Sequence, residues 1–279
     1  MAKNIFKEKL IEYGVNIDKI DANSPVILIG TLFSKDNEEL AKELKEKQDK
    51  IVYCSALDDT FFHIKNYMRV KYEVGAEVGL LALLAKQLFE DSDLLCEKTK
   101  EYLDELDDGY LSAESNISEE EISKIAALIK NSSKCTLLFG EDIYNHPNTE
   151  ELAGILSILV KYKNLHVSLL ENLSHLSQKN SNHLPQIDEL KSYDGTIVYL
   201  LPNQEEDKKL FGSAQFGIAA KIEDGDIVEM EIDGKRYKRE FCLRDDAKGT
   251  VAILPLKESF EEYRFKKTKI TKRVLNEQN

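Results

Sequence analysis

The chain has 279 residues and a formal net charge of −13, and hydrophobic residues make up 42% of it. This apolar content is enough for a folded core, so the acidity does not indicate disorder. Strong acidity argues against a nucleic-acid-binding protein, which usually presents a basic face. Residues 78–85 come nearest to a membrane span but number only eight, whereas a spanning helix needs about 20. The N-terminal segment carries charges throughout, so we expect no secretory signal and a cytoplasmic location.

From residue 26 on, short apolar runs alternate with amphipathic stretches. The run "PVILIG" at 25–30 predicts a buried strand, and "KDNEELAKELKEKQ" at 35–48 predicts a helix with Leu40 and Leu44 inside. A second buried strand is predicted over 50–55.

The stretch "KYEVGAEVGLLALLAKQLF" at 71–89 contains two glycines four residues apart, Gly75 and Gly79. It does not follow a strand through a tight turn, and neither G-x-G-x-x-G nor G-x-x-x-x-G-K-[ST] occurs, which argues against a phosphate loop. Apolar residues lie all round the predicted helix, which is typical of an interior helix. We therefore expect Gly75 at the entry to a buried helix and Gly79 at a close packing contact.

The acidic segment that follows is predicted as helix and then loop. A helix over 117–130 begins with a capping box formed by Ser118 and Glu121. The remaining elements are strands at 134–140, 165–171 and 195–202 and a helix at 148–162. This order predicts an α/β domain over residues 1–202, with a mainly parallel sheet covered by helices on both faces.

After Pro202 the pattern changes to period-two alternation. Residues 225–245 alternate around the turn pair Asp233 and Gly234, which predicts a β-hairpin, and 249–256 predicts another strand. Residues 203–279 are therefore predicted to form a small all-β, barrel-like module with a basic C-terminal tail.

The four cysteines, Cys54, Cys96, Cys135 and Cys242, are widely spaced and form no C-x-x-C pair. Iron–sulfur clusters and structural zinc sites usually use closely spaced cysteines, so we expect neither metal nor cofactor. Cys54 and Cys135 lie in apolar runs and are predicted to be buried, and Cys242 lies in a strand-like segment. None of the histidines at 63, 166, 175 and 183 shows the i, i+4 spacing of a helical metal pair.

Ligand sites in open α/β sheets lie beyond the C-terminal ends of the strands. Three such ends are predicted here, at residues 30–34, 55–59 and 140–146. The last offers Glu141, Asp142, Tyr144 and His146, which would suit acid/base chemistry or a metal. The alternative is a polar loop whose turn is made by Asn145 and Pro147. No catalytic residue is selected, because such a set requires burial and shifted pKa values that a sequence does not reveal.

The stretch at 71–89, with "VILIGT" before it and "FGEDIYNHPNTEELAGIL" after it, resembles the C-terminal half of one component of bacterial NADH-quinone oxidoreductase (respiratory complex I). That component is the large peripheral polypeptide whose C-terminal half belongs to the molybdopterin oxidoreductase superfamily. In addition, "GDIVEMEIDGKRYKREFCLRDDAKGTVAILPL" resembles the β-barrel module that closes such chains. The resemblance spans about residues 20–260. It implies a membrane-associated respiratory complex, but the clustered cysteines of the family's iron–sulfur domains have no counterpart here, nor has its molybdenum-binding position.

Charge is strongly segregated along the chain. Residues 101–120 contain eight acidic residues and no basic one, whereas the last 17 residues contain six basic residues. The six are Arg264, Lys266, Lys267, Lys269, Lys272 and Arg273. One interpretation is that they dock on an acidic surface of a neighbouring subunit, and the other is that both segments are simply solvated.

Two hypotheses follow. The chain is expected to be an accessory subunit of an NADH-quinone oxidoreductase-type complex at the inner face of the cell membrane, without cofactor, nucleic acid or direct membrane insertion. The alternative is an autonomous α/β protein or enzyme that binds a nucleotide-like ligand in the strand-end crevice.

Overall fold

The computed structural model describes residues 4–21, 23–45, 51–57, 67–90, 93–162, 164–170, 184–187, 189–202, 208–258 and 261–273. The chain forms two compact units, of which the first ends at Ser192 and the second begins at Tyr193. The boundary expected between residues 202 and 203 is therefore placed too late. Strand β6 (Ile197–Leu201) pairs with strands of the second unit, not with the parallel sheet of the first.

Five parallel strands form the sheet of the first unit. They are β1 (Val26–Ile29), β2 (Ile51–Ser55), β3 (Met68–Lys71), β4 (Cys135–Phe139) and β5 (Leu165–Leu169). Their order across the sheet is β3-β2-β1-β4-β5, so the direction of winding reverses between β1 and β4. The edge strand β3 was not predicted, because Arg69 and Lys71 hide its pattern and only Val70 is buried.

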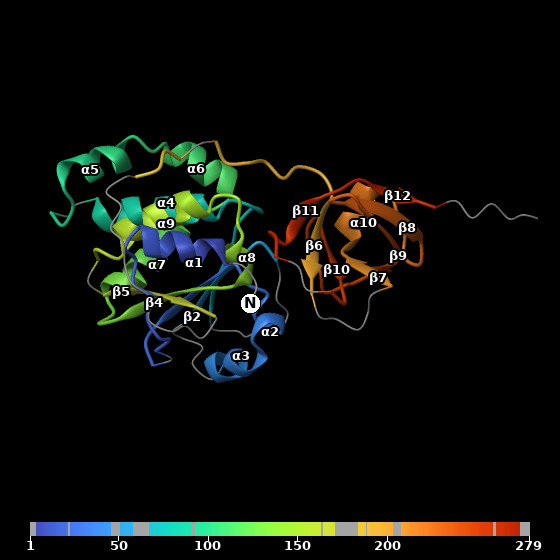
Figure 1. Cartoon of the computed structure of the whole chain (residues 1–279), viewed down its shortest axis with the longest axis horizontal. Coiled ribbons are helices and arrows are strands. Elements are labelled where there is room, and N and C mark those ends of the chain that lie inside the picture. The colour runs from blue at the N-terminus through green and yellow to red at the C-terminus, as the bar shows by residue number, and fades with distance from the viewer. Residues whose placement is uncertain are drawn as a thin grey trace, which may run out of the picture. The chain divides into compact units, whose positions relative to one another are not determined.

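The central strands of this sheet are buried on both faces. Val26 and Leu28 pack in one cluster with Ala41 and Leu44 of α3 (Glu38–Lys45). Their neighbours Ile27 and Ile29 point to the opposite face. In Figure 1, α2 (Phe33–Asp36) and α3 lie on one side of the strands, and α1 (Ile5–Glu12), α4 (Glu77–Phe89) and α9 (Thr149–Leu159) lie on the other. The prediction of a parallel sheet with helices on both faces is confirmed.

Helix α4 is a core helix, as predicted. Eleven of its 13 residues are buried. Gly75 precedes it with φ of 84°, in the left-handed region that favours glycine. A Cβ added at Gly79 would lie 3.2 Å from both the Cβ of Ser115 and the Cδ1 of Leu190, so Gly79 does permit close packing.

Three further helices separate α4 from β4: α5 (Glu97–Asp104), α6 (Asp108–Ser115) and α7 (Glu119–Lys130). The acidic segment therefore forms two helices, α5 and α6, where helix and then loop was expected. The predicted capping box is present at the start of α7, where the backbone N–H of Glu121 donates to Ser118 Oγ at 3.3 Å. The N–H of Ser118 donates to the Glu121 carboxylate at 2.9 Å.

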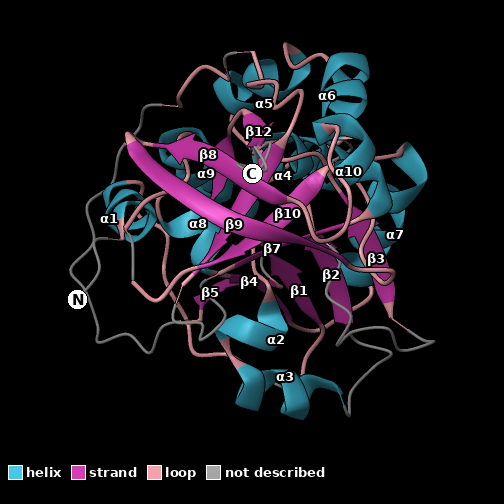
Figure 2. Cartoon of the chain, turned by 90° about the vertical axis from the view of Figure 1, so that its right-hand side faces the viewer, coloured by secondary structure: helices cyan, strands magenta, loops and turns pink. Residues whose placement is uncertain are grey.

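The second unit is built on a curled, mixed sheet of seven strands (Figure 2). Besides β6 it contains β7 (Lys209–Gly212), β8 (Ile227–Ile232), β9 (Lys235–Leu243), β10 (Val251–Pro255), β11 (Phe265–Lys267) and β12 (Ile270–Lys272). The order is β11-β6-β10-β7-β9-β8-β12. The predicted hairpin joins β8 to β9, and its turn residues Asp233 and Gly234 have φ of 50° and 76°, as a type I′ turn requires.

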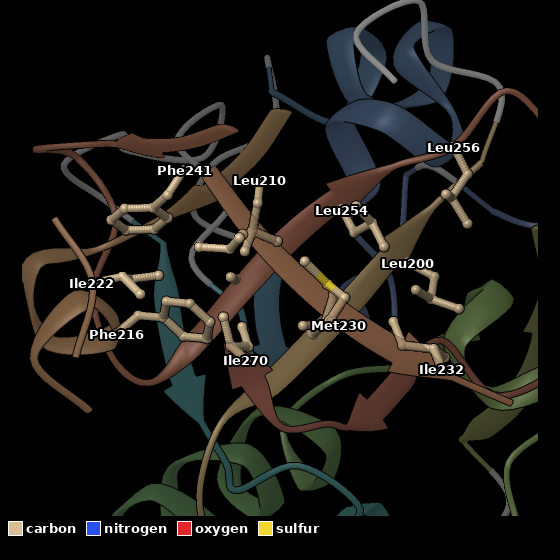
Figure 3. Packing of buried hydrophobic residues seen from close by; sticks show 13 residues of the cluster. Leu200, Leu210, Phe216, Ile222, Met230, Ile232, Phe241, Leu254, Leu256 and Ile270 are labelled. Atoms are coloured by element: carbon tan, nitrogen blue, oxygen red, sulfur yellow. The ribbon is translucent and has the colours of Figure 1, made fainter. Parts of the chain in front are cut away.

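One apolar cluster fills the inside of the curled sheet (Figure 3). Phe216 enters it from the short helix α10 (Ala214–Ala220), with its ring centroid 6.0 Å from that of Phe241 on β9. Met230 and Ile270 join it from β8 and β12. The module is thus a barrel-like β unit with one helix packed on its core.

Candidate functional site

The three strand ends that the sequence singled out lie side by side. Strand β1 pairs with β2 on one side and with β4 on the other, and Ile29 is in register with both Cys54 and Phe139. The loops that follow these strands therefore share the C-terminal edge of the sheet, on both sides of the point where the winding reverses. The loop after β2 continues into residues 58–66, which lie outside the described residues.

The turn from β1 into α2 holds a carboxylate of its own. Asp36 Oδ2 accepts hydrogen bonds from Thr31 Oγ1 at 2.7 Å and from the backbone N–H of Leu32 at 3.0 Å. Tyr53, on the neighbouring strand, donates its hydroxyl to the carbonyl of Thr31 at 2.7 Å. In doubly wound domains that bind nucleotides, the turn after the first strand offers such N–H groups to a phosphate. Here the Asp36 carboxylate takes that position.

The loops after β1 and β4 are pressed together at the winding reversal. A Cβ added at Gly140 would lie 2.2 Å from the Cβ of Thr31 and 2.7 Å from the carbonyl oxygen of Gly30. A Cβ at Gly30 would lie 2.4 Å from the side chain of Ile143. The N–H of Asp142 also donates to the carbonyl of Gly30 at 3.1 Å. Backbone and side chains of the protein itself therefore fill the space between these two loops.

The four polar residues expected after β4 have different environments. Glu141, in the short helix α8 (Glu141–Tyr144), is exposed, whereas Asp142, Tyr144 and His146 are buried. The ring of His146 contacts Glu77 in the first turn of α4, with its Nε2 3.0 Å from Glu77 Oε2 and both side chains fully buried. Sequence reasoning missed Glu77, although a lone carboxylate at the start of an otherwise apolar helix was a usable signal.

Hydrogen bonding defines the protonation of the His146 ring. Its Nδ1 accepts a hydrogen bond from the backbone N–H of Asn148 at 3.0 Å, so Nδ1 carries no proton. The single ring proton therefore lies on Nε2 and is donated to the carboxylate of Glu77. Both ring nitrogens are engaged within the fold, and this arrangement suits a structural link better than a general base.

The cysteines and histidines were also considered as metal ligands. Cys54 and Cys135 are buried as predicted, and burial raises the pKa of the Cys135 thiol to about 12. His166 contacts Asp18, with 2.6 Å between Nδ1 and Oδ2. The other three histidines that the sequence singled out, at positions 63, 175 and 183, lie outside the described residues. Within the described ranges, no group of three or more His, Cys, Asp or Glu side chains is placed to hold a metal ion.

Most of the basic residues near the C-terminus have partners within their own unit. Arg264 is 3% exposed and donates from Nη1 to the hydroxyl of Tyr199 at 2.8 Å. The ammonium of Lys266 contacts the carboxylates of Asp233 and Glu262.

The end of the chain's described part continues this arrangement. Lys272 lies 2.8 Å from Asp226, and Arg273 lies 3.5 Å from Glu229. Lys267 and Lys269 are exposed, and among the described residues neither forms an ion pair. The proposed docking residues thus belong largely to β11 and β12 and their flanks.

No family model matches the chain, and no curated protein matches it. Among the described helices, none combines the length and the apolar character that crossing a membrane requires.

Proposed function

We propose that this chain is a non-catalytic accessory subunit of a respiratory complex of the NADH-quinone oxidoreductase type. In this proposal, a molybdopterin oxidoreductase-like α/β domain and a β module serve as an assembly surface without a cofactor of their own. The subunit belongs to the cytoplasmic, peripheral part of the complex.

The observation that carries the proposal is the closed crevice at the winding reversal. Gly140 and Thr31 approach too closely to leave a ligand space between them, and the carboxylate of Asp36 holds the N–H group that a phosphate would need. A second negative charge placed beside Asp36 would be repelled. The alternative function, a nucleotide-like ligand in this crevice, is therefore disfavoured on steric and electrostatic grounds.

The saturated pair of Glu77 and His146 supports the same conclusion. A catalytic histidine needs one ring nitrogen within hydrogen-bond reach of a substrate. Both nitrogens of His146 are used by Glu77 and Asn148. A protein that keeps the architecture of an α/β enzyme while filling its crevice is suited to assembly with other chains.

The test is a native-gel experiment in the source organism. The full chain carries an affinity tag at its chromosomal locus, membranes are solubilised in mild detergent, and the gel is stained for NADH oxidation. We expect the tag in the same high-mass band as the activity. A tag that migrates only at the mass of the free chain would overturn the proposal.

A second measurement addresses the alternative function directly. The melting temperature of the purified chain is measured with and without inorganic phosphate, a mononucleotide and a dinucleotide. We expect no increase, because the crevice is filled. An increase that grows with nucleotide concentration, as linkage requires for a specific ligand, would favour the alternative.

A further inference from the structure

A groove of about 690 Å³ lies on the first unit between α4, α5, α6 and the start of α7. Its apolar lining consists of Leu83, Phe89, Leu95, Leu103, Ile117 and Ile122. Each of these side chains is at most 9% exposed, so they form a floor below a polar rim. Grooves of this size accommodate several side chains of a bound segment or a small ligand.

The groove exists because α4 and α6 diverge along their length. At one end Gly79 has no side chain, and Leu111 and Ser115 of α6 lie directly over it. At the other end the ammonium of Lys86 separates the two helices, contacting Asp108 at 2.6 Å and the carbonyl of Leu106 at 2.6 Å. The hollow is thus held open by a buried strut and is part of the built structure.

The rim of the groove has an excess of negative charge. Its two ammonium groups are already paired, Lys86 with Asp108 and Lys100 with Asp93. Three further carboxylates line the groove, those of Glu90, Asp104 and Glu119. All three are exposed, and within the described residues none of them forms an ion pair with a cation. An apolar floor below a carboxylate rim is complementary to a segment with apolar and basic side chains.

We propose that this groove binds a basic amphipathic segment of a partner protein. Apolar side chains of the segment enter the floor lined by Leu83, Leu103 and Ile122, and its Lys or Arg side chains pair with Glu90, Asp104 and Glu119. Amphipathic helices bind apolar grooves in this way in many complexes. The inference gives the acidic segment of residues 101–120 a receiving role and rests on the proposed function only for the identity of the partner.

The probe is a fluorescent synthetic peptide of about 14 residues, which makes about four helical turns. It carries Leu at helical positions i, i+3, i+4 and i+7 and Lys elsewhere. One control peptide replaces Lys by Glu, and another replaces Leu by Gln. Fluorescence anisotropy with the full chain measures the dissociation constant of each peptide. We expect binding of the Lys/Leu peptide and at least about tenfold weaker binding of both controls, because each lacks one of the two complementary features.

Matched variants locate the binding site. Glu90→Gln/Asp104→Asn/Glu119→Gln removes the rim charges and should weaken binding about tenfold, the sum of three modest ion pairs. Glu101→Gln/Glu105→Gln/Glu114→Gln makes the same change in net charge on exposed positions outside the groove and should change binding less than about twofold. Gly109→Leu fills the groove from α6 without changing charge and should also weaken binding. Circular dichroism confirms that each variant is folded.

Three results would overturn the inference: no binding to the wild-type chain, equal weakening by the two triple variants, or equal binding of the Lys/Gln and Lys/Leu peptides. The second result would mean that only the general acidity of the chain attracts the peptide. The native-gel experiment does not use the groove. A chain that migrates with the NADH-oxidising complex and yet binds no peptide would keep the proposed function and lose this inference.

Discussion

His146 and Glu77 lie 69 positions apart in the sequence, and their side chains meet at 3.0 Å in a fully buried hydrogen bond. This contact joins the start of α4 to the segment between α8 and α9. It places the only carboxylate of the α4 core helix next to the ring proton of His146. The link therefore holds the helices that follow β3 and β4 at the C-terminal edge of the sheet.

Removing the carboxylate of Glu77 should destabilise the protein. Glu77→Ala leaves the Nε2–H group of His146 buried without this acceptor, and such a loss costs about 1–3 kcal/mol in the free energy of unfolding. Glu77→Gln keeps a side-chain oxygen as acceptor and should cost less. Urea denaturation measures both. Glu120→Ala is the control, because Glu120 is exposed and forms only an i, i+4 pair with Lys124. Equal stabilities of Glu77→Ala and Glu120→Ala would contradict the role of the link.

Gly140→Ala should force the loops after β1 and β4 apart. The new Cβ would lie 2.2 Å from the Cβ of Thr31, and overpacking of this kind typically costs about 1–3 kcal/mol. Thermal unfolding measures the loss. The same substitution at Gly109 is the control, since the only atom near its added Cβ is Asp107 Oδ1 at 3.3 Å and alanine favours a helix. A Gly140→Ala variant as stable as Gly109→Ala would show that the two loops are not in close contact.

Stability should fall in strong alkali through Tyr102. Burial, aided by the charge of Glu151, raises the pKa of Tyr102 from 10.0 to about 12, and its hydroxyl donates to the carbonyl of Pro185 at 3.0 Å. Because the folded-state pKa lies above the unfolded value, this contribution is present below pH 10 and is lost as the pH rises toward 12.

The measurement is the free energy of unfolding of wild type and Tyr102→Phe across this pH range. The variant loses one hydrogen bond but has no phenol to ionise, so its curve should fall less steeply between pH 10 and about 12. Tyr237→Phe, at a partly exposed position on β9, serves as the control and should follow the wild-type slope. Parallel curves for wild type and Tyr102→Phe would disprove the assignment.

Truncation after Tyr263 should damage the fold of the second unit. It removes β11 and β12, which pair with β6 and β8, and it removes the buried guanidinium that contacts Tyr199. Exposed strand edges promote association between chains. We therefore expect loss of stability and aggregation in size-exclusion chromatography. Lys267→Ala/Lys269→Ala removes only exposed charges and should remain monodisperse. A stable, monodisperse truncated chain would show that these strands are dispensable.

Local patterns of the sequence were sufficient to predict much of the fold. The apolar runs at β1, β2, β4 and β5 predicted buried parallel strands, since only strands covered on both faces lack alternation. The capping box of Ser118 and Glu121 predicted the start of α7, and the pair Asp233 and Gly234 predicted the hairpin, because these signals act over three or four residues. In the same way, the apolar circumference of α4 predicted its burial.

Only the tertiary structure decided which elements and side chains meet. The run that forms β6 would be equally apolar in either sheet, so its pairing with β10 and β11 was not predictable from its pattern. The basic composition of the last residues suggested a solvated tail, yet Arg264 is buried against Tyr199, 65 positions away. The contact between Glu77 and His146 has the same origin. Hydrophobic periodicity reports which face of an element is buried, whereas the partner on that face depends on strand order and helix packing across the whole chain.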